Sequence, residues 1–468
     1  MKTALHYLIF LILASLGVWL RLNYYEPLDR SVSNYDTDRY TRSNESSIFS
    51  QEFYTSIRQP SVALVYQLVE SPTGYELTNL SSPGDDIQPA LKVQPGFDRI
   101  ALLQSGLSIF AWLLLAWVVF RNIRISALGF LGAILILLFG FTPQMAEWDY
   151  VMLSEPISMT SFVILFALSI ELVVSLLKDQ QLLKWKTKFL MAGWFLVAAI
   201  WLFARDTNSY LLLPIIDLIM LLVWRKTARE KLSWRFLVTA GLTLLCLFLV
   251  AARLSQISDR WVNPYFNNLL ARVLPVPEYR AYFEARGLPV TEALMAEVGG
   301  NLTELSLFQM TDLVTWVEEK GLATYFGFML THPGWAIGTF SDGAAMAFTE
   351  NVQPFFRRNS EVTAEFLVYL GGLLHPKDAA MIFVVAMQLL FLGILAAKNG
   401  LTIAITLSFL FSVFFLGELL MLFVAIHGDA AGIVRHSMGS VMPLRLSLWL
   451  LPLFIFDVMG SAVLFAKK

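Results

Sequence analysis

Two aspartates, Asp36 and Asp38, stand one residue apart in a long polar segment, and Arg39 and Arg42 follow them closely. The segment, residues 22–98, separates a first apolar stretch from a series of others. A carboxylate held in such a place can act as the general base that takes a proton from an attacking hydroxyl. The same residues could instead form a solvated acidic turn or a helix cap at Asp36. Because Asp-x-Asp is a short pattern, the spacing alone leaves both interpretations open.

A second group of acids comes before the fourth apolar stretch. Glu147 and Asp149 lie in Glu-Trp-Asp-Tyr, and Glu155 lies in Ser-Glu-Pro where the apolar stretch begins. An anion is favourable at a helix N-terminus and Pro156 suits a first turn, so a plain cap explains Glu155. In the functional interpretation, Glu155 faces a cavity and holds a sugar hydroxyl or a metal ion. That interpretation requires Asp36 to lie opposite.

Two arginines could hold a phosphate. Arg205 follows the fifth apolar stretch, and Arg435 and His436 precede the last one. A phosphate leaving group needs fixed positive charge, which arginine supplies through two parallel hydrogen bonds, and stabilising such developing charge is usually the largest catalytic effect. The alternative is that these arginines bind lipid headgroups or pair with loop acids. His332, which precedes Pro-Gly in a later loop, could simply cap a turn.

The composition places these residues in a membrane protein. The chain has 468 residues, of which 57% are hydrophobic and 15% charged, and its apolar runs are about as long as a bilayer is thick. A net charge of -2 gives no basic footprint, so we expect no nucleic-acid partner. The one cysteine, Cys246, lies inside an apolar run, so no intrachain disulfide can hold the loops together.

We therefore predict an all-α polytopic membrane protein. Helices satisfy their backbone hydrogen bonds internally, as lipid requires. The first stretch could pass for a signal peptide, but Arg-Leu-Asn-Tyr-Tyr-Glu after it offers no small-residue cleavage site, so we expect a retained helix. About ten transmembrane helices are expected, near residues 4–20, 100–120, 125–141, 157–177, 190–203, 210–224, 236–252, 379–397, 401–423 and 441–465.

Basic residues fall in alternate loops, which predicts the orientation of these helices. The loops that carry them, and both termini, should be cytoplasmic. All the candidate residues named above then lie in outer loops, in a first module (1–252), a second outer loop (253–378) and a final group of helices (379–468). The basic residues are Arg121, Arg124, Lys178, Lys184, Lys186, Lys188, Arg225, Lys226, Arg229, Lys231, Arg235, Lys398, Lys467 and Lys468.

The second outer loop should contain two kinds of surface helix. Residues 302–317 place apolar side chains at helical spacing with acids between them, which predicts an amphipathic helix on the membrane surface. The apolar piece 325–348 is broken at 332–334 and 341–343, so we expect a re-entrant or surface segment. Within the spans, we expect an ion pair between Glu418 and Arg445.

The chain resembles the GT-C superfamily, the multi-spanning glycosyltransferases that use polyprenyl-phosphate-linked sugars, in a bacterial mannosyltransferase or ArnT-like form. In that family a first helix is followed by a large outer loop with an acidic catalytic residue, then a Tyr and a Pro-containing helix start. Asp36, Tyr40 and Arg-Gln-Pro at 58–60 are similar to this pattern. The likeness covers the first 225 residues best. No motif is specific alone; order, sidedness and spacing carry the resemblance.

Later positions extend the resemblance. Glu155 is similar to the acidic residue that these enzymes place at a span start, and Arg205 with Pro214 resembles their Arg or Lys followed by a helix with Pro. Thr-His-Pro-Gly around His332, and the run from Arg435-His436 to Pro443, resemble bacterial members.

The chain also departs from the family. Protein O-mannosyltransferases carry Asp-Glu where this chain has Asp-Thr-Asp, and Gln59-Pro60 replaces the usual paired prolines. The last part of the chain shows no long soluble domain of the oligosaccharyltransferase kind. We therefore expect a lipid or glycan acceptor rather than a protein.

The resemblance implies a transferase that moves a sugar from a polyprenyl phosphate to an acceptor hydroxyl, by inversion, on the periplasmic face of a bacterial inner membrane. It implies Asp36 as base, or Asp38 if the register is off by two, with Arg205 and Arg435 on the phosphate. Glu155 would shape the sugar or bind a divalent ion, with Asp38 as a further ligand. The substrate site would also include Tyr40, Glu147, Asp149, His332 and His436.

Other classes remain open. A lipid-linked glycan ligase or polymerase would depend more on the arginines and on a histidine in the late loop. A polyprenyl-lipid flippase or transporter would explain the helices and leave the large outer loops without a role. A structural scaffold would bind no lipid phosphate.

Overall fold

The chain folds into helices, and each of the ten expected apolar stretches forms one. The computed structural model describes residues 3–33, 36–56, 58–69, 74–76, 94–179, 185–224, 234–258, 260–299, 309–350, 352–356, 361–400 and 402–466. The apolar helices are α1 (Ala4–Asn23), α5 (Asp98–Asn122), α6 (Ser126–Phe141), α8 (Glu155–Asp179), α9 (Trp185–Leu202), α10 (Leu212–Trp224), α12 (Trp234–Ile257), α21 (Met381–Lys398), α22 (Thr402–Gly428) and α23 (Ile433–Ala466).

The expected count of ten membrane spans is not confirmed among the described residues. Among the described residues, seven helices are long and apolar enough to cross a bilayer, namely α1, α5, α8, α12, α21, α22 and α23. An eighth span arises if α6 is joined to the segment Pro143–Tyr150, from which it is bent by 52°. The described part of α10 has 13 residues, about 20 Å at 1.5 Å per residue, against a hydrocarbon core of about 30 Å. Helix α9 has polar residues, Lys186 and Lys188, in its first turn.

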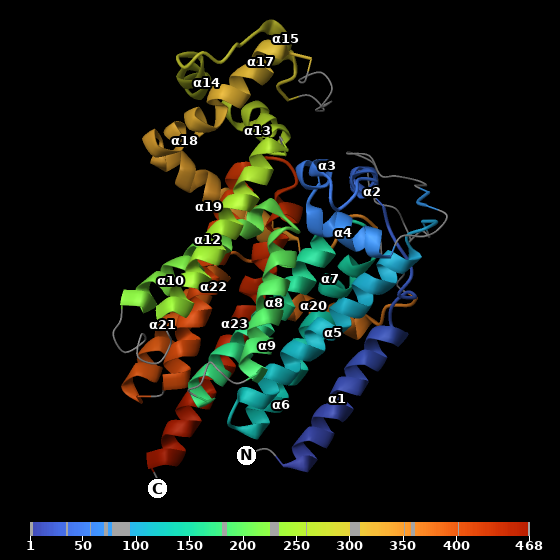
Figure 1. Cartoon of the computed structure of the whole chain (residues 1–468), viewed down its shortest axis with the longest axis vertical. Helices are drawn as coiled ribbons and strands as arrows, with labels where there is room; N and C mark the ends of the chain where they lie inside the picture. Colours follow the sequence, from blue (N-terminus) through green and yellow to red (C-terminus); the bar gives the residue numbers. More distant parts are fainter. Residues whose placement is uncertain are drawn as a thin grey trace.

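The bundle has two distinct ends (Figure 1). Both termini lie at one end, together with the turn between α5 and α6 and the lower end of α8. We call this the common end. The described basic residues of the loops expected in the cytoplasm lie here, as the charge pattern predicts. Short helices cover the other end, which we call the outer end: α2 (Thr37–Asn44), α3 (Gln51–Thr55), α4 (Pro60–Leu68), α7 (Pro143–Ala146) and α20 (Glu365–Leu374), with the 3₁₀ turns η1 (Glu147–Tyr150) and η2 (Asp206–Leu211).

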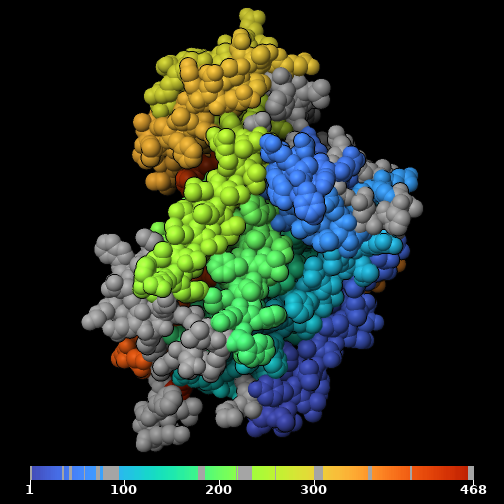
Figure 2. Space-filling view, in the orientation of Figure 1, coloured from blue at the N-terminus to red at the C-terminus, as the bar shows by residue number. Residues whose placement is uncertain are grey.

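A helical lobe stands on the outer end above α12, as a knob beside α2 and α3 (Figure 2). Its aromatic core includes Phe283, Trp316 and Phe328. The lobe consists of α13 (Val262–Asn268), α14 (Pro277–Glu284), α15 (Glu292–Ala296), α17 (Thr311–Trp316) and α18 (Leu322–Thr331), with π-helical turns η3 (Leu269–Val273) and η4 (Val317–Gly321). Of the expected amphipathic helix 302–317, residues 302–308 lie outside the described residues.

The segment 325–348 breaks once and not twice. Helix α18 ends at Thr331, and α19 (Pro333–Thr349) begins after His332, since Pro333 suits a first turn. The expected second break at 341–343 is wrong, because α19 continues through it. Gly343 is there for packing: a Cβ on it would overlap Ile426 of α22. Helix α19 packs against α22 and α23, and it is not among the candidate spans of the described residues.

Charged groups within the bundle find partners different from those expected. Arg445 donates to the backbone carbonyls of Pro376, Phe348 and Glu350, at 3.0, 3.1 and 3.2 Å. It forms no ion pair with Glu418, so that expectation is wrong. A guanidinium carries five donors in a fixed fork, which suits several carbonyls as well as one carboxylate.

A close approach between α5 and α6 gives the first testable prediction. A Cβ on Gly140 would overlap the indole of Trp112, whereas Gly106 on α5 has open space around it. We expect Gly140→Ala to destabilise the bundle by about 1–3 kcal/mol, the usual cost of overpacking. Gly106→Ala is the matched control and should leave the thermal midpoint in detergent unchanged or slightly higher. Equal midpoints for the two variants would contradict this packing.

Candidate active site

A short backbone pairing places Asp36. The amide of Val32 donates to the carbonyl of Tyr150 at 2.8 Å, and the amide of Met152 donates to the carbonyl of Val32 at 2.9 Å. The Thr37 hydroxyl donates to the carbonyl of Met152 at 2.9 Å. These bonds dock the first outer loop on the segment that leads into α8. Asp36 therefore stands at the start of α2, close to the N-terminus of α8.

A buried arginine supports this docking from below. Arg21, in the last turn of α1, donates to the Tyr150 hydroxyl at 3.0 Å and to the carbonyl of Ala146 at 3.2 Å. Its Nη2 also lies 3.4 Å from Asp149 Oδ2. Asp149 is therefore engaged in a structural ion pair, and its assignment to the substrate site is not supported.

The centre of the site is one arginine shared by two carboxylates. Arg435 Nη1 lies 2.8 Å from Asp36 Oδ2, and its Nε lies 3.5 Å from Glu155 Oε1. Arg58 contacts Asp36 Oδ1, and Arg205 Nη1 lies 3.0 Å from Glu155 Oε1. Asp36 and Glu155 thus face each other across Arg435, which is the condition that the functional interpretation of Glu155 required. We call these five residues the Asp36 cluster.

Helix ends bring the Asp36 cluster together. Glu155 begins α8, Arg205 lies between α9 and η2, and Arg435 is in the first turn of α23. The amide of Ser61 at the start of α4 donates to the carbonyl of Phe203 at the end of α9, at 3.1 Å. Segments separated by hundreds of residues therefore converge at the outer end of the bundle.

The Asp36 cluster is buried and carries an excess of positive charge. Asp36 is 4% exposed, Glu155 2% and Arg205 8%. Two carboxylates face three arginines, and Arg39 lies 4.0 Å from Asp36 as a fourth. Burial alone would raise the pKa of Asp36, but Arg58 and Arg435 outweigh it and hold that pKa below its ordinary value. Such a site attracts an anion such as a phosphate.

The donor set does not fit a divalent ion at Glu155. Its Oε1 is already shared by Arg205 and Arg435, and cations repel one another. Among the residues that the structure describes, no group of three or more His, Cys, Asp or Glu side chains could hold a metal. A metal held by Glu155 and Asp38 stays a prediction from the sequence, and we derive no chemical step through it.

Several buried polar atoms next to the Asp36 cluster have no hydrogen-bond partner among the described residues. Leaving a buried polar group unpaired costs about 1–3 kcal/mol, so these atoms favour a polar ligand that would satisfy them. Asn208 belongs here because its Nδ2 donates to Ser158 Oγ in the first turn of α8, at 3.0 Å. The unpartnered atoms are Arg58 Nε, Gln59 Nε2, Tyr66 Oη, Asn208 Oδ1 and Ser437 Oγ.

His436 connects the Asp36 cluster to the lobe. Its Nδ1 lies 3.2 Å from Arg205 Nη2, and its Nε2 lies 3.4 Å from Asp429 Oδ2. Because a guanidinium can only donate, Nδ1 must accept and the imidazole proton must sit on Nε2, facing Asp429. Asn267 of α13 donates to Asp429 Oδ1 at 2.8 Å. A movement of the lobe would therefore shift Arg205 through Asp429 and His436.

The other expected site residues lie apart from the Asp36 cluster or at its edge. The Arg58 guanidinium lies 4.9 Å from the ring centre of buried Tyr40, so Tyr40 supports the cluster from one side. Asp38 is half-buried on α2, and the ion pairs described at the cluster involve Asp36 instead. Glu147 accepts from Gln353 Nε2 at 3.1 Å, and the His332 ring contacts Phe328 in the lobe, tilted by 30° with ring centres 4.3 Å apart.

These placements put two of the expected substrate-site residues away from the Asp36 cluster, and their roles stay predictions. The Oε2 atom of the buried Glu147 accepts from an amide, and His332 packs on aromatic rings of the lobe, away from the Asp36 cluster. Conversely, Arg58 and Asp429 were not singled out as site residues. Arg58 entered only as part of the Arg-Gln-Pro pattern at 58–60, with no role of its own, and Asp429 is one of many loop acids whose type and spacing gave no signal.

Comparison with models of known protein families finds no match for this chain, and comparison with curated proteins finds none. Among solved structures, the archaeal oligosaccharyltransferase AglB from Archaeoglobus fulgidus, in complex with an inhibitory peptide and a dolichol-phosphate, is similar with a TM-score of 0.41 and 11% identity. The similarity covers 95% of this chain and 50% of that one, so this chain spans about half its length. A likeness at this level is too weak to assign a function.

Asp36 gives a prediction for acid conditions. Because its pKa is lowered in the folded protein, its ion pairs stabilise the fold above the ordinary carboxylate pKa of 3.8. That stabilisation is lost as the pH falls through the lowered value. We expect Asp36→Asn to unfold at a lower temperature than wild type at about pH 7, and the difference to shrink towards about pH 3. A difference independent of pH, measured by thermal unfolding in detergent, would contradict these ion pairs.

Proposed function

We propose that this chain transfers a sugar from a polyprenyl-phosphate carrier to an acceptor hydroxyl. The carrying observation is the buried cluster in which Arg435 is shared by Asp36 and Glu155, with Arg58 and Arg205 alongside. It combines a carboxylate that could take a proton with excess positive charge that could hold a phosphate. An acid and a phosphate clamp at one point are what such a transfer requires.

The phosphate of the donor would bind Arg205 and Arg435. In the free protein these arginines are occupied by Glu155 and Asp36. A phosphate brings its own negative charge, so it can replace a carboxylate as their partner without leaving a buried cation unpaired. The donor would thereby release Asp36 from Arg435, raise its basicity and prepare it for proton transfer.

Asp36 would then act as general base. The acceptor hydroxyl gives its proton to the Asp36 carboxylate while its oxygen forms a bond to the anomeric carbon of the sugar. The bond from that carbon to the phosphate oxygen breaks, and the lipid phosphate leaves with the electron pair, its charge stabilised by Arg205 and Arg435. A single displacement of this kind inverts the anomeric carbon and needs no covalent enzyme intermediate.

The sugar would lie among the unpartnered polar atoms. Tyr66 Oη, Gln59 Nε2 and Asn208 Oδ1 offer both donors and acceptors, which suits a group with several hydroxyls. Glu155 would shape this pocket from the start of α8. The acceptor would be a lipid or a glycan, reaching Asp36 from the outer end of the bundle.

The proposed location follows from the charge pattern. The Asp36 cluster lies at the end of the bundle opposite the two termini (Figure 1). With the basic loops in the cytoplasm, this end faces the periplasm of a bacterial inner membrane. The transferred sugar would then belong to glycans assembled outside the cytoplasm.

Paired aspartate variants test the base. We expect Asp36→Asn to lower the consumption of synthetic polyprenyl-phosphate sugars by about 10²–10⁴-fold, the usual contribution of a general base. Asp38→Asn is the matched control and should keep most of the activity. The measurement is release of radiolabelled sugar by purified protein in detergent, with water as a poor acceptor. An active Asp36→Asn protein would refute the role.

A glycan ligase or polymerase is the second candidate, favoured by the contact of His436 with Arg205. In that reaction the arginines and the histidine carry more of the catalysis. His436→Ala should then lower turnover of a lipid-linked glycan more than Asp36→Asn does, whereas in the proposed transferase the order is reversed. Flipping of the lipid carrier without donor consumption, unaffected in Asp36→Asn, would instead identify a flippase.

A further inference from the structure

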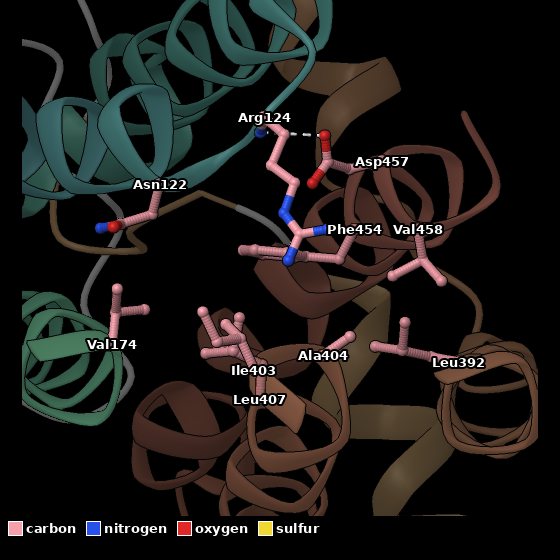
Figure 3. A pocket seen from close by; sticks show the side chains of 10 residues that line it. All are labelled: Asn122, Arg124, Val174, Leu392, Ile403, Ala404, Leu407, Phe454, Asp457 and Val458. Carbon is pink, nitrogen blue, oxygen red and sulfur yellow. Dashed lines mark hydrogen bonds between the residues drawn. The ribbon is translucent and has the colours of Figure 1, made fainter. Parts of the chain in front are cut away.

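The common end of the bundle contains a hollow that plays no part in the proposed chemistry. Its cavity volume is about 90 Å³, and the space including its open mouth is about 610 Å³. Helices α5, α8, α21, α22 and α23 and the turn that leads into α6 surround it. Apolar side chains form its walls, among them Val174, Ile403, Leu407 and Phe454, while Asn122 and Arg124 stand at its rim (Figure 3).

Arg124 points into this hollow with its charge unmatched. Figure 3 shows its side chain reaching from the turn after α5 towards Phe454, above Ile403 and Leu407. The guanidinium is exposed and forms no ion pair or hydrogen bond among the described residues. Most of the lining beneath it is apolar, and the carboxylate of Asp457, which also lines the hollow, accepts backbone amides.

The acids near Arg124 are committed elsewhere. Asp457 Oδ1 accepts the backbone amides of Arg124 and Ile125, at 2.9 and 2.8 Å, and so caps the start of α6. Glu171 lies 3.5 Å from both Arg121 and Lys186. Of the described cations Arg121, Arg124 and Lys186, only the Arg124 side chain has no ion pair among the described residues.

An apolar hollow beneath an arginine without an ion pair suits a lipid with a negative headgroup. A glycerophospholipid with a negative headgroup presents a phosphate beside acyl chains, and a cation at the cytoplasmic surface attracts such lipids. Some of the lining residues lie at helix ends, as Asn122 does at the end of α5 and Ile403 near the start of α22. This is the depth at which headgroups meet the hydrocarbon region.

We propose that this hollow binds one acidic glycerophospholipid. The Arg124 guanidinium binds the headgroup phosphate, and an acyl chain lies along Ile403, Leu407 and Phe454. The lipid would join the α5–α6 turn to α21, α22 and α23. The site is at the end of the bundle opposite the Asp36 cluster, so it does not depend on the proposed transferase activity.

The test measures lipid binding by the full purified chain. Delipidated protein in detergent is titrated with phosphatidylglycerol, and bound lipid is counted by native mass spectrometry alongside the thermal midpoint. We expect one tightly bound lipid, a higher midpoint, and about tenfold weaker binding by Arg124→Gln, as for loss of one charge-assisted contact. Ala404→Trp, which fills the hollow and keeps Arg124, should also lose the bound lipid.

Matched controls separate this site from general attraction to anions. Arg235 is exposed at the start of α12 and does not line the hollow, so Arg235→Ala should bind phosphatidylglycerol as wild type does. Phosphatidylcholine should bind more weakly, and glycerol 3-phosphate alone should not raise the midpoint. Equal binding by wild type and Arg124→Gln, or stabilisation by glycerol 3-phosphate alone, would overturn the proposal. Equal binding by Ala404→Trp would do the same.

Discussion

The shared Arg435 is the interaction on which the outer end of this protein depends. Asp36 and Glu155 are almost fully buried at the end of an apolar bundle, where a lone carboxylate would be costly. Arg435 lies between them and neutralises both, helped by Arg58 and Arg205. Every segment that ends here, from the first loop to the last helix, must therefore place its charged side chain next to one of opposite charge.

Contacts around the Asp36 cluster hold these charged side chains in place. The backbone bridge at Val32 and Val151 joins the first loop to the segment before α8. Arg21 fixes the same segment from the end of α1 through Asp149 and Tyr150. If either contact broke, buried polar atoms would lose their hydrogen-bond partners, which is costly. A substrate phosphate can exchange partners within such a site because the surrounding positions are held.

The fold and the site differed in how far they could be predicted. Apolar runs identified all ten helices, because run length and burial in lipid follow directly from local composition. The count of ten spans is not confirmed, because only seven of these helices are long and apolar enough to cross a bilayer over their described residues. Among the site residues, Asp36, Glu155, Arg205, Arg435 and His436 do converge, while Glu147, Asp149 and His332 contact other partners.

The sequence by itself determined that this chain is an all-helical membrane protein with its long polar segments on one side, because hydropathy and loop charge act locally along the chain. Tertiary structure alone decided which acid meets which arginine. Asp36 and Asp38 are equivalent in the sequence, yet one faces Arg58 and Arg435 and the other does not join these ion pairs. Contacts between residues about 400 positions apart depend on how helices pack, and no spacing within one segment encodes that choice.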